Sequence, residues 1–314
     1  MRLALAEIAA GKDPTYRNLV PGVLSYREYE RRLRLWDEVR KKIGLDGEFD
    51  ETAVTLMFPP GWMDEAQLVG DRLGLNRRPT GRVAMGLDSA QGGDNASWCI
   101  GDGLGMLDLV SMKTPDTSVI IPKTIELMQQ WGIDSEDVCL DHGGGGKEHG
   151  DRLREMGYRG VRIISFGAGP TDPNLYRRMK TSDEKRDERE TKYRYKNRRA
   201  EIYGLARNML NPVLNEQVYG MPTVLMERTR SDGHVGLRGQ LAPVPLLYDG
   251  DGRMFLPPKN PPSDPARRAH VNREKSLSEI IGCSPDESDA FGLMIYAKEV
   301  KSASFVIGKS GMRK

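Results

Sequence analysis

Short apolar segments separated by glycine, aspartate and asparagine begin at residue 82 and predict a series of β-strands. Residues 82–88, 96–103 and 106–112 are each long enough to form one strand, and the connections between them are short. Because short connections join antiparallel neighbours, these three segments predict an antiparallel meander.

The next part of the chain changes to helical periodicity. In residues 116–132, one helical face is expected to carry apolar side chains, with Asp116 or Thr117 as the cap: Ile120, Ile121, Thr124, Ile125 and Met128. A short buried strand over 137–141, a helix that opens at a glycine run, and a strand over 160–167 follow. Strands that first meander and then alternate with helices predict an α/β fold, in which a mixed sheet of antiparallel and then parallel strands is flanked by helices.

The segments around this sheet predict three parts of the chain. Residues 1–60 are polar and have helical spacing at Leu33, Trp36, Val39 and Ile43. We expect 1–78 to be a helical connector, 79–302 the main domain and 303–314 a flexible tail. Within the main domain, the later pattern predicts a helix over 197–210, a hairpin with an Asp-Gly turn over 244–258, and a last helix over 284–300.

Composition excludes several classes of protein. The 314 residues contain 38% hydrophobic positions and no long apolar run, so we expect no membrane span. No charged and then apolar leader opens the sequence, which favours a cytoplasmic location. The cysteines Cys99, Cys139 and Cys283 are far apart and form no C-x-x-C pair, so no disulfide framework or zinc knuckle is indicated.

Three acidic residues lie where the predicted elements begin or end. Asp88 ends the first strand, Asp141 ends the strand after the first long helix, and Asp286 opens the last helix. If the first and fourth strands are neighbours, both strand-end carboxylates leave the same edge of the sheet. Clustered carboxylates raise one another's pKa and are costly unless cations bind them. Oxygen ligands suit Mg²⁺ or Mn²⁺, and two such ions about 4 Å apart support phosphodiester cleavage.

Each acid also has a purely structural interpretation. Asp88 and Asp141 precede polar or glycine-rich turns, where aspartate is common. Asp286 is a favourable first-turn residue of a helix. Asp94 can be an outer metal ligand or order its loop, and Asp289 can share the site or bond locally to the backbone.

Basic residues are concentrated between residues 177 and 199, where eleven Lys/Arg stand against five Asp/Glu. Phosphate binding and a solvated helix surface with ion pairs are equally compatible with this composition. The candidates for DNA binding are Lys147, Arg177, Arg178, Lys180, Lys196 and Arg198.

Taken together, four segments resemble the nuclease domain of phage terminase large subunits. The segments are GLDSAQGGDNAS, VCLDHGGGGKEHGDRLREMGY, YKNRRAEIYGLARNML and LSEIIGCSPDESDAFGLMIYA, and their order and spacing agree with the family over residues 82–300. The resemblance implies a ribonuclease H-like fold and a two-metal endonuclease that cuts concatemeric double-stranded DNA during genome packaging. It implies Asp88, Asp141 and Asp286 as ligands of two Mg²⁺ or Mn²⁺ ions, with Asp94 and Asp289 as auxiliaries, and helix-start geometry favours Asp286 over Asp289.

The resemblance also implies partners in the host cytoplasm: double-stranded DNA, a portal protein, a small terminase subunit and a packaging ATPase domain or chain. No G-x-x-x-x-G-K-[ST] loop occurs in this sequence, so we expect no ATPase activity from it. Residues 30–67 resemble the end of the ATPase domain and its connector, which favours a split gene, an alternative start or an excised domain.

Two alternative functions remain open. Another ribonuclease H-like nuclease, of the resolvase or transposase type, would use similar acids, although the N-R-R-A-E helix favours a terminase. A catalytically inactive module that docks on DNA or on a portal would keep the fold without binding metal.

Overall fold

The computed structural model describes residues 55–89, 95–113, 115–177, 190–264, 268 and 274–301. All of these belong to one compact unit that begins at Thr55. The apolar spacing expected around 33–43 and the tail expected over 303–314 lie outside the described residues. So do three candidate site residues, Asp94, Arg178 and Lys180.

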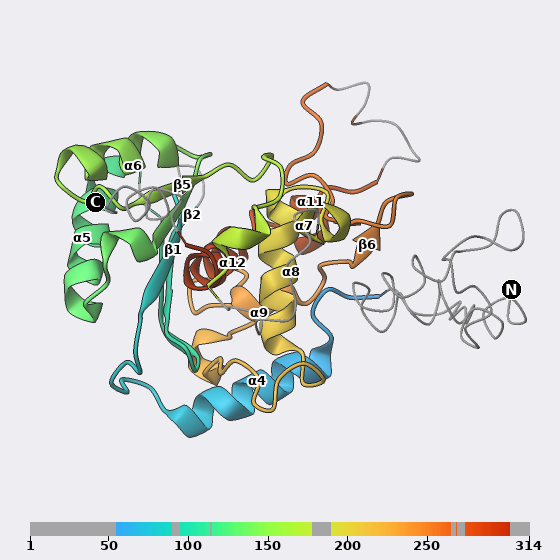
Figure 1. Ribbon diagram of the computed structural model, residues 1–314, viewed down its shortest axis with the longest axis horizontal. Helices are drawn as coiled ribbons and strands as arrows, with labels where there is room; N and C mark the ends of the chain where they lie inside the picture. Colours follow the sequence, from blue (N-terminus) through green and yellow to red (C-terminus); the bar gives the residue numbers. More distant parts are fainter. Residues whose placement is uncertain are drawn as a thin grey trace, which may run out of the picture. The chain divides into compact units, whose positions relative to one another are not determined.

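A five-stranded sheet in the order β3-β2-β1-β4-β5 forms the centre of this unit (Figure 1). Strands β1 (Ala84–Asp88), β2 (Asn95–Gly101) and β3 (Met106–Lys113) are antiparallel neighbours. Strands β4 (Val138–Asp141) and β5 (Arg162–Ile164) add to β1 in parallel. The predicted mixed sheet, a meander followed by parallel strands, is therefore confirmed.

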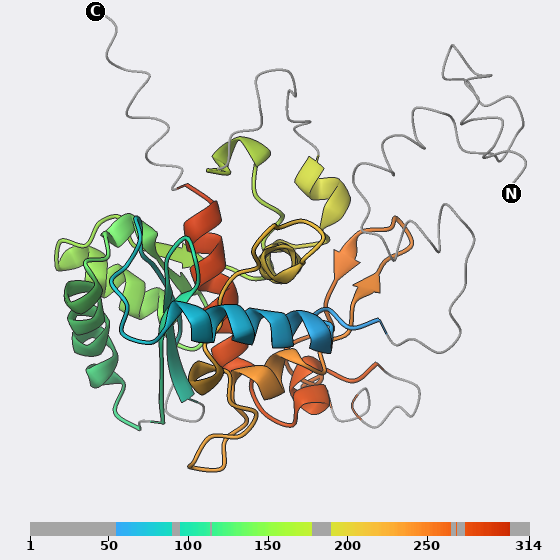
Figure 2. The same ribbon diagram turned by 90° about the horizontal axis from the view of Figure 1, so that it is seen from below.

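Helices cover both faces of the sheet, as the two ribbon views show (Figures 1 and 2). On one face, α5 (Ile120–Trp131) and α6 (Gly146–Glu155) pack on Met85, Leu87 and Trp98. On the other face, α12 (Asp286–Glu299) packs on Ala84 and Cys99, and α8 (Arg198–Leu210) packs on α12. Alternate residues of a strand point to opposite faces, and these two apolar sets follow that alternation.

The central position of α12 depends on a glycine in β1. A Cβ atom added to Gly86 would lie 2.1 Å from Ala290 O and 2.4 Å from Met294 N of α12. Only a residue without a side chain therefore allows the helix backbone to approach the strand this closely. Since α12 is buried on nearly every side, its apolar positions do not form a single stripe.

Shorter elements surround this core. Helix α4 (Pro60–Leu73), which we expected in the connector, is held to the same unit, since Met221 N donates to Ala66 O at 2.8 Å. The predicted hairpin is formed by β6 (Leu247–Tyr248) and β7 (Met254–Phe255). The remaining short helices are η2 (Thr117–Val119), η3 (Ser135–Asp137), η4 (Pro173–Leu175), α7 (Glu190–Arg194), η5 (Thr223–Leu225), α9 (Leu237–Leu241) and α11 (Leu277–Ile281). No helix in the described part of the chain is long and apolar enough to cross a membrane.

Candidate metal centre

Two carboxylates leave the sheet side by side at the carboxyl ends of β1 and β4. The parallel pairing matches Leu87 with Leu140, so Asp88 and Asp141 occupy the next position of each strand. Both are buried, with 4% of Asp88 and 8% of Asp141 exposed. A hydrogen bond from Ser89 Oγ to Gly144 O, 3.1 Å long, joins the segments that follow the two strands.

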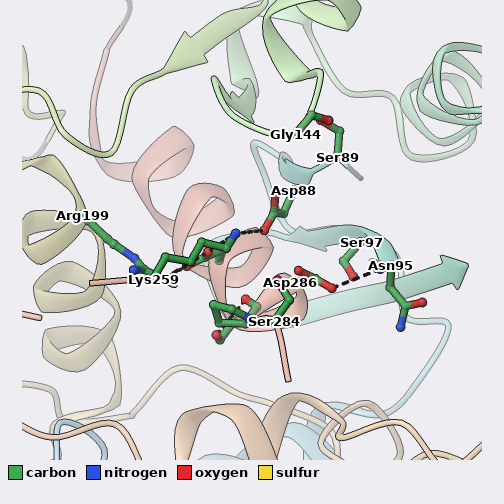
Figure 3. A network of polar contacts seen from close by, with 12 residues as sticks. Asp88, Ser89, Asn95, Ser97, Gly144, Arg199, Lys259, Ser284 and Asp286 are labelled. Carbon is green, nitrogen blue, oxygen red and sulfur yellow. Dashed lines mark hydrogen bonds and ion pairs between the residues drawn. The ribbon is translucent and has the colours of Figure 1, made fainter. Parts of the chain in front are cut away.

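The first turn of α12 brings two more carboxylates to the same end of the sheet. Asp286 Oδ2 accepts a hydrogen bond of 3.2 Å from the backbone N–H of Asn95, where β2 begins (Figure 3). Asp289, three residues further along the same turn, is fully buried. It accepts hydrogen bonds from Tyr203 Oη at 2.7 Å and from Arg199 Nη2 at 3.2 Å, both on α8. The helix start thus faces the strand ends that carry Asp88 and Asp141.

A lysine from the segment between β7 and α11 reaches into this cluster. Lys259 Nζ lies 2.9 Å from Asp88 Oδ2 and 2.9 Å from Asp289 Oδ2, and Figure 3 shows its side chain extended toward Asp88. Lys259 was not among the predicted site residues, because it lies in an irregular P-P-K-N-P-P segment with no periodic signal. The ammonium partly neutralises the acids from the β1 end and from α12 at once.

Burial and mutual repulsion shape the titration of these acids. Burial raises the pKa of Asp88 well above its usual range; the charges of Asp289, Asp141 and Asp286 add to this, while Lys259 opposes it. Burial likewise raises the pKa of Asp141, with Lys259 again opposing. For Asp289, burial would raise the pKa, but Arg199 and Lys259 outweigh it and the pKa is lowered. The four carboxylates of the cluster are therefore only partly neutralised by Lys259 and Arg199.

The donor set fits a hard divalent cation in its chemistry. Carboxylate oxygens are the ligands that Mg²⁺ and Mn²⁺ prefer, and the raised pKa of Asp88 marks a place where added positive charge is stabilising. As the side chains stand, however, the described residues contain no group of three His, Cys, Asp or Glu arranged to hold an ion. Lys259 instead lies between Asp88 and Asp289.

Helix α8 contributes supporting residues that sequence analysis did not assign. Arg199 and Tyr203 orient Asp289, and burial together with the charge of Asp289 raises the pKa of Tyr203 well above its usual range. Buried Glu201 accepts hydrogen bonds from Thr171 N at 2.9 Å and from Tyr176 Oη at 2.5 Å. The N-R-R-A-E segment predicted this helix through its resemblance to the terminase family, but it did not predict which residues the side chains of the helix contact.

The described basic candidates differ in their surroundings. Three of them form ion pairs: Lys147 with Asp151 at 2.8 Å, Arg177 with Asp137 at 3.0 Å, and Arg198 with Glu201 at 3.0 Å. Lys196 is exposed, and its ammonium lies 5.1 Å from the centroid of the Phe255 ring. The basic segment therefore does not behave as one uniform surface.

Comparison with known proteins places the fold. No protein-family model and no curated protein matches the chain. Among solved structures, the nuclease domain of the large terminase subunit gp2 of bacterial virus Sf6 is similar at 15% identity and a TM-score of 0.53, over 77% of this chain and 98% of that one. A mutant of this subunit solved with calcium is similar at 14% identity and a TM-score of 0.53, over 77% of this chain and 99% of that one. A mutant of this domain solved with manganese and beta-thujaplicinol is similar at 13% identity and a TM-score of 0.52, over 77% of this chain and 98% of that one.

Identities this low carry information about the fold alone. The likeness covers nearly the whole length of the Sf6 domain, and the part of this chain that matches is built on the mixed sheet described above. The chain thus has a ribonuclease H-like fold, similar to that of the nuclease domain of a phage terminase large subunit.

Proposed function

We propose that this protein is a metal-dependent endonuclease that cuts concatemeric double-stranded DNA during phage genome packaging. The observation that carries the proposal is the meeting of Asp88, Asp141 and Asp286 at one end of a sheet with a ribonuclease H-like fold. Carboxylates from adjacent parallel strands and a helix start supply the oxygen donors that phosphodiester hydrolysis by divalent ions requires.

In this proposal, Asp88, Asp141 and Asp286 hold two Mg²⁺ or Mn²⁺ ions, with Asp94 and Asp289 as auxiliaries. The bound ions would activate a water molecule and stabilise the leaving oxygen of the phosphodiester. Asp289 is already hydrogen-bonded to Arg199 and Tyr203, which favours a role in orienting α12 and in balancing charge. Asp286 is then the preferred third ligand.

Lys259 has a defined part in this arrangement. Its ammonium bonds to one oxygen each of Asp88 and Asp289, so it competes with a cation for the same acids. Metal binding therefore requires Lys259 to release at least Asp88. Its side chain, about a quarter exposed, can then turn its charge toward a phosphate oxygen of the substrate.

The proposal extends to partners and place of action. Basic side chains position DNA by its phosphates, because a cutter of packaged genomes needs little base recognition. From the resemblance, we also propose a portal protein, a small terminase subunit and a packaging ATPase domain or chain as partners, in the cytoplasm of the host cell. No ATPase activity is proposed for this chain.

The test is cleavage of supercoiled plasmid in Mn²⁺, Mg²⁺, Ca²⁺ and chelator. We expect nicking and linearisation in Mn²⁺ or Mg²⁺ and none in chelator, with activity that falls steeply between about 50 and 200 mM salt. Asp88→Asn should fold normally, since it removes a charge from a repulsive cluster, but should not cut. Asp134→Asn, the same change at an exposed position before the opposite end of β4, is the matched control and should cut normally. Cleavage by Asp88→Asn at the rate of the control would remove Asp88 from the mechanism.

A second candidate function is an inactive docking module for DNA or a portal. The observation that favours it is Lys259 between Asp88 and Asp289, where a cation would otherwise balance the acids. Titration with Mn²⁺ separates the two functions: a nuclease gains melting temperature with ion concentration, whereas a module without a metal site does not. Cleavage of linear duplex without junction preference or strand transfer separates a terminase-like enzyme from a resolvase or transposase.

A further inference from the structure

A cavity of about 600 Å³ opens beside the acidic cluster. Asp141 and Lys259 line it on the side of the cluster, and Phe166, Lys196 and Phe255 are also among the residues that line it. Its volume lies within the roughly 300–1,000 Å³ of ordinary ligand pockets. A group bound here would therefore lie next to the proposed site of cleavage.

Lys196 is held in this cavity by two contacts with β7. Its backbone N–H donates to Met254 O at 2.9 Å, so the base of the side chain is fixed beside the strand. Its ammonium lies 5.1 Å from the centroid of the Phe255 ring, within the range of a cation–π contact. Because the ammonium covers the ring, Phe255 orients the charge.

The electrostatic surroundings set Lys196 apart from the other described basic candidates. Lys147, Arg177 and Arg198 each pair with a carboxylate. The ammonium of Lys196 has no carboxylate partner among the described residues, although Glu274 also lines the cavity. Among the basic candidates that the structure describes, Lys196 is therefore the one whose charge is available to an anion.

We propose that this cavity is a second phosphate subsite, in which Lys196 binds the backbone phosphate next to the scissile phosphate on the cleaved strand. The inference rests on the proposed nuclease function. It adds a positioning residue that sets where the strand lies over Asp141, with Phe255 as the support of the ammonium. Lys196 contributes to substrate affinity and takes no part in the bond that breaks.

The test compares Lys196→Ala and Lys196→Arg with Lys123→Ala, which removes a lysine from α5 on the other face of the sheet. In cleavage assays with Mn²⁺, Lys196→Ala should raise KM about tenfold, leave kcat within about twofold, and reduce the slope of log affinity against log salt by about one. Lys196→Arg should restore most of the affinity. Lys123→Ala should behave as wild type, and an unchanged KM and salt slope in Lys196→Ala would overturn the subsite.

A second variant tests phosphate against base recognition. Phe255→Leu keeps the apolar packing but removes the aromatic face, and should raise KM only about two- to fivefold. A larger rise in KM for Phe255→Leu than for Lys196→Ala would mean that a base stacks on the ring, and would overturn the phosphate assignment.

Binding without cleavage separates this inference from the proposed function. Asp88→Asn protein is mixed with a fluorescent duplex in Ca²⁺, with and without Lys196→Ala. Weaker binding caused by Lys196→Ala supports the subsite even if wild-type protein cuts nothing, in which case the nuclease proposal alone fails. Equal binding by the two proteins removes the subsite even if wild-type protein cuts.

Discussion

Replacing Lys259 by methionine removes the ammonium between Asp88 and Asp289 and keeps an unbranched side chain of similar length. Both contacts are 2.9 Å long, and both acids are almost completely buried. In metal-free protein, Asp289 then keeps its ion pair with Arg199. Asp88 loses Lys259, its cationic partner among the contacts described above. The variant should therefore be less stable without metal.

The size of this effect follows from the burial of the partners. Removing one member of a buried ion pair costs about 3–5 kcal/mol. Lys259 is 26% exposed and Asp289 keeps Arg199, which places the loss near the lower end of that range. A loss of about 3 kcal/mol corresponds to a fall in Tm of roughly 6–12 °C for a domain of this size.

The assay is thermal unfolding of wild type and variant in chelator and across an Mn²⁺ titration. Because the ions no longer compete with an ammonium, Mn²⁺ should raise the Tm of Lys259→Met more than that of wild type; an ion at about 100 times its Kd contributes about 2.7 kcal/mol. Lys123→Met is the control, since Lys123 is 28% exposed and, within the described part of the chain, forms its ion pair with the exposed Glu126. Equal melting in chelator, or equal gains from Mn²⁺, would refute the competition between Lys259 and metal.

Two further predictions concern the scaffold. Gly86→Ala should destabilise the protein by about 3 kcal/mol in denaturant unfolding, because its Cβ would meet α12 backbone atoms. Gly61→Ala, whose Cβ would have no atom within 4 Å, is the control, and similar values for the two variants would refute the close approach. Asp102 is buried, but hydrogen bonds from Arg77 and three backbone N–H groups outweigh burial and lower its pKa. A group whose pKa is lowered by folding stabilises the protein at pH values above its unfolded-state pKa, and this stabilisation is lost as the pH falls through its folded-state pKa. The destabilisation caused by Asp102→Asn should therefore be large near neutral pH and smaller in acid. A difference that is independent of pH would refute this assignment.

Much of the fold could be predicted because its signals are local. The meander over β1 to β3 and the strand–helix alternation that follows appear in the spacing of apolar residues, and both were confirmed. The pairing of β1 with β4 was a conditional expectation, and it brings Asp88 and Asp141 together. That these acids bind metal stays a prediction.

Other features of the site depend on contacts between distant segments and leave no periodic signal. Lys259 lies in an irregular segment and reaches acids about 171 and 30 positions away along the chain. A count of basic residues predicts a positive surface, but it does not distinguish Arg177, which bonds to Asp137, from Lys196, which has no such partner among the described residues. Side-chain partners, not composition, decide which charges remain available.

The contact between Gly86 and α12 has a consequence for the spacing of the acids. Asp88 stands two residues after Gly86 in one strand, and Asp286 stands four residues before Ala290 in the helix that touches it. Main-chain atoms, not flexible side chains, therefore fix how far apart these acids can be. Changes in the number of residues between β1 and β2 should therefore leave the spacing between Asp88 and Asp286 intact.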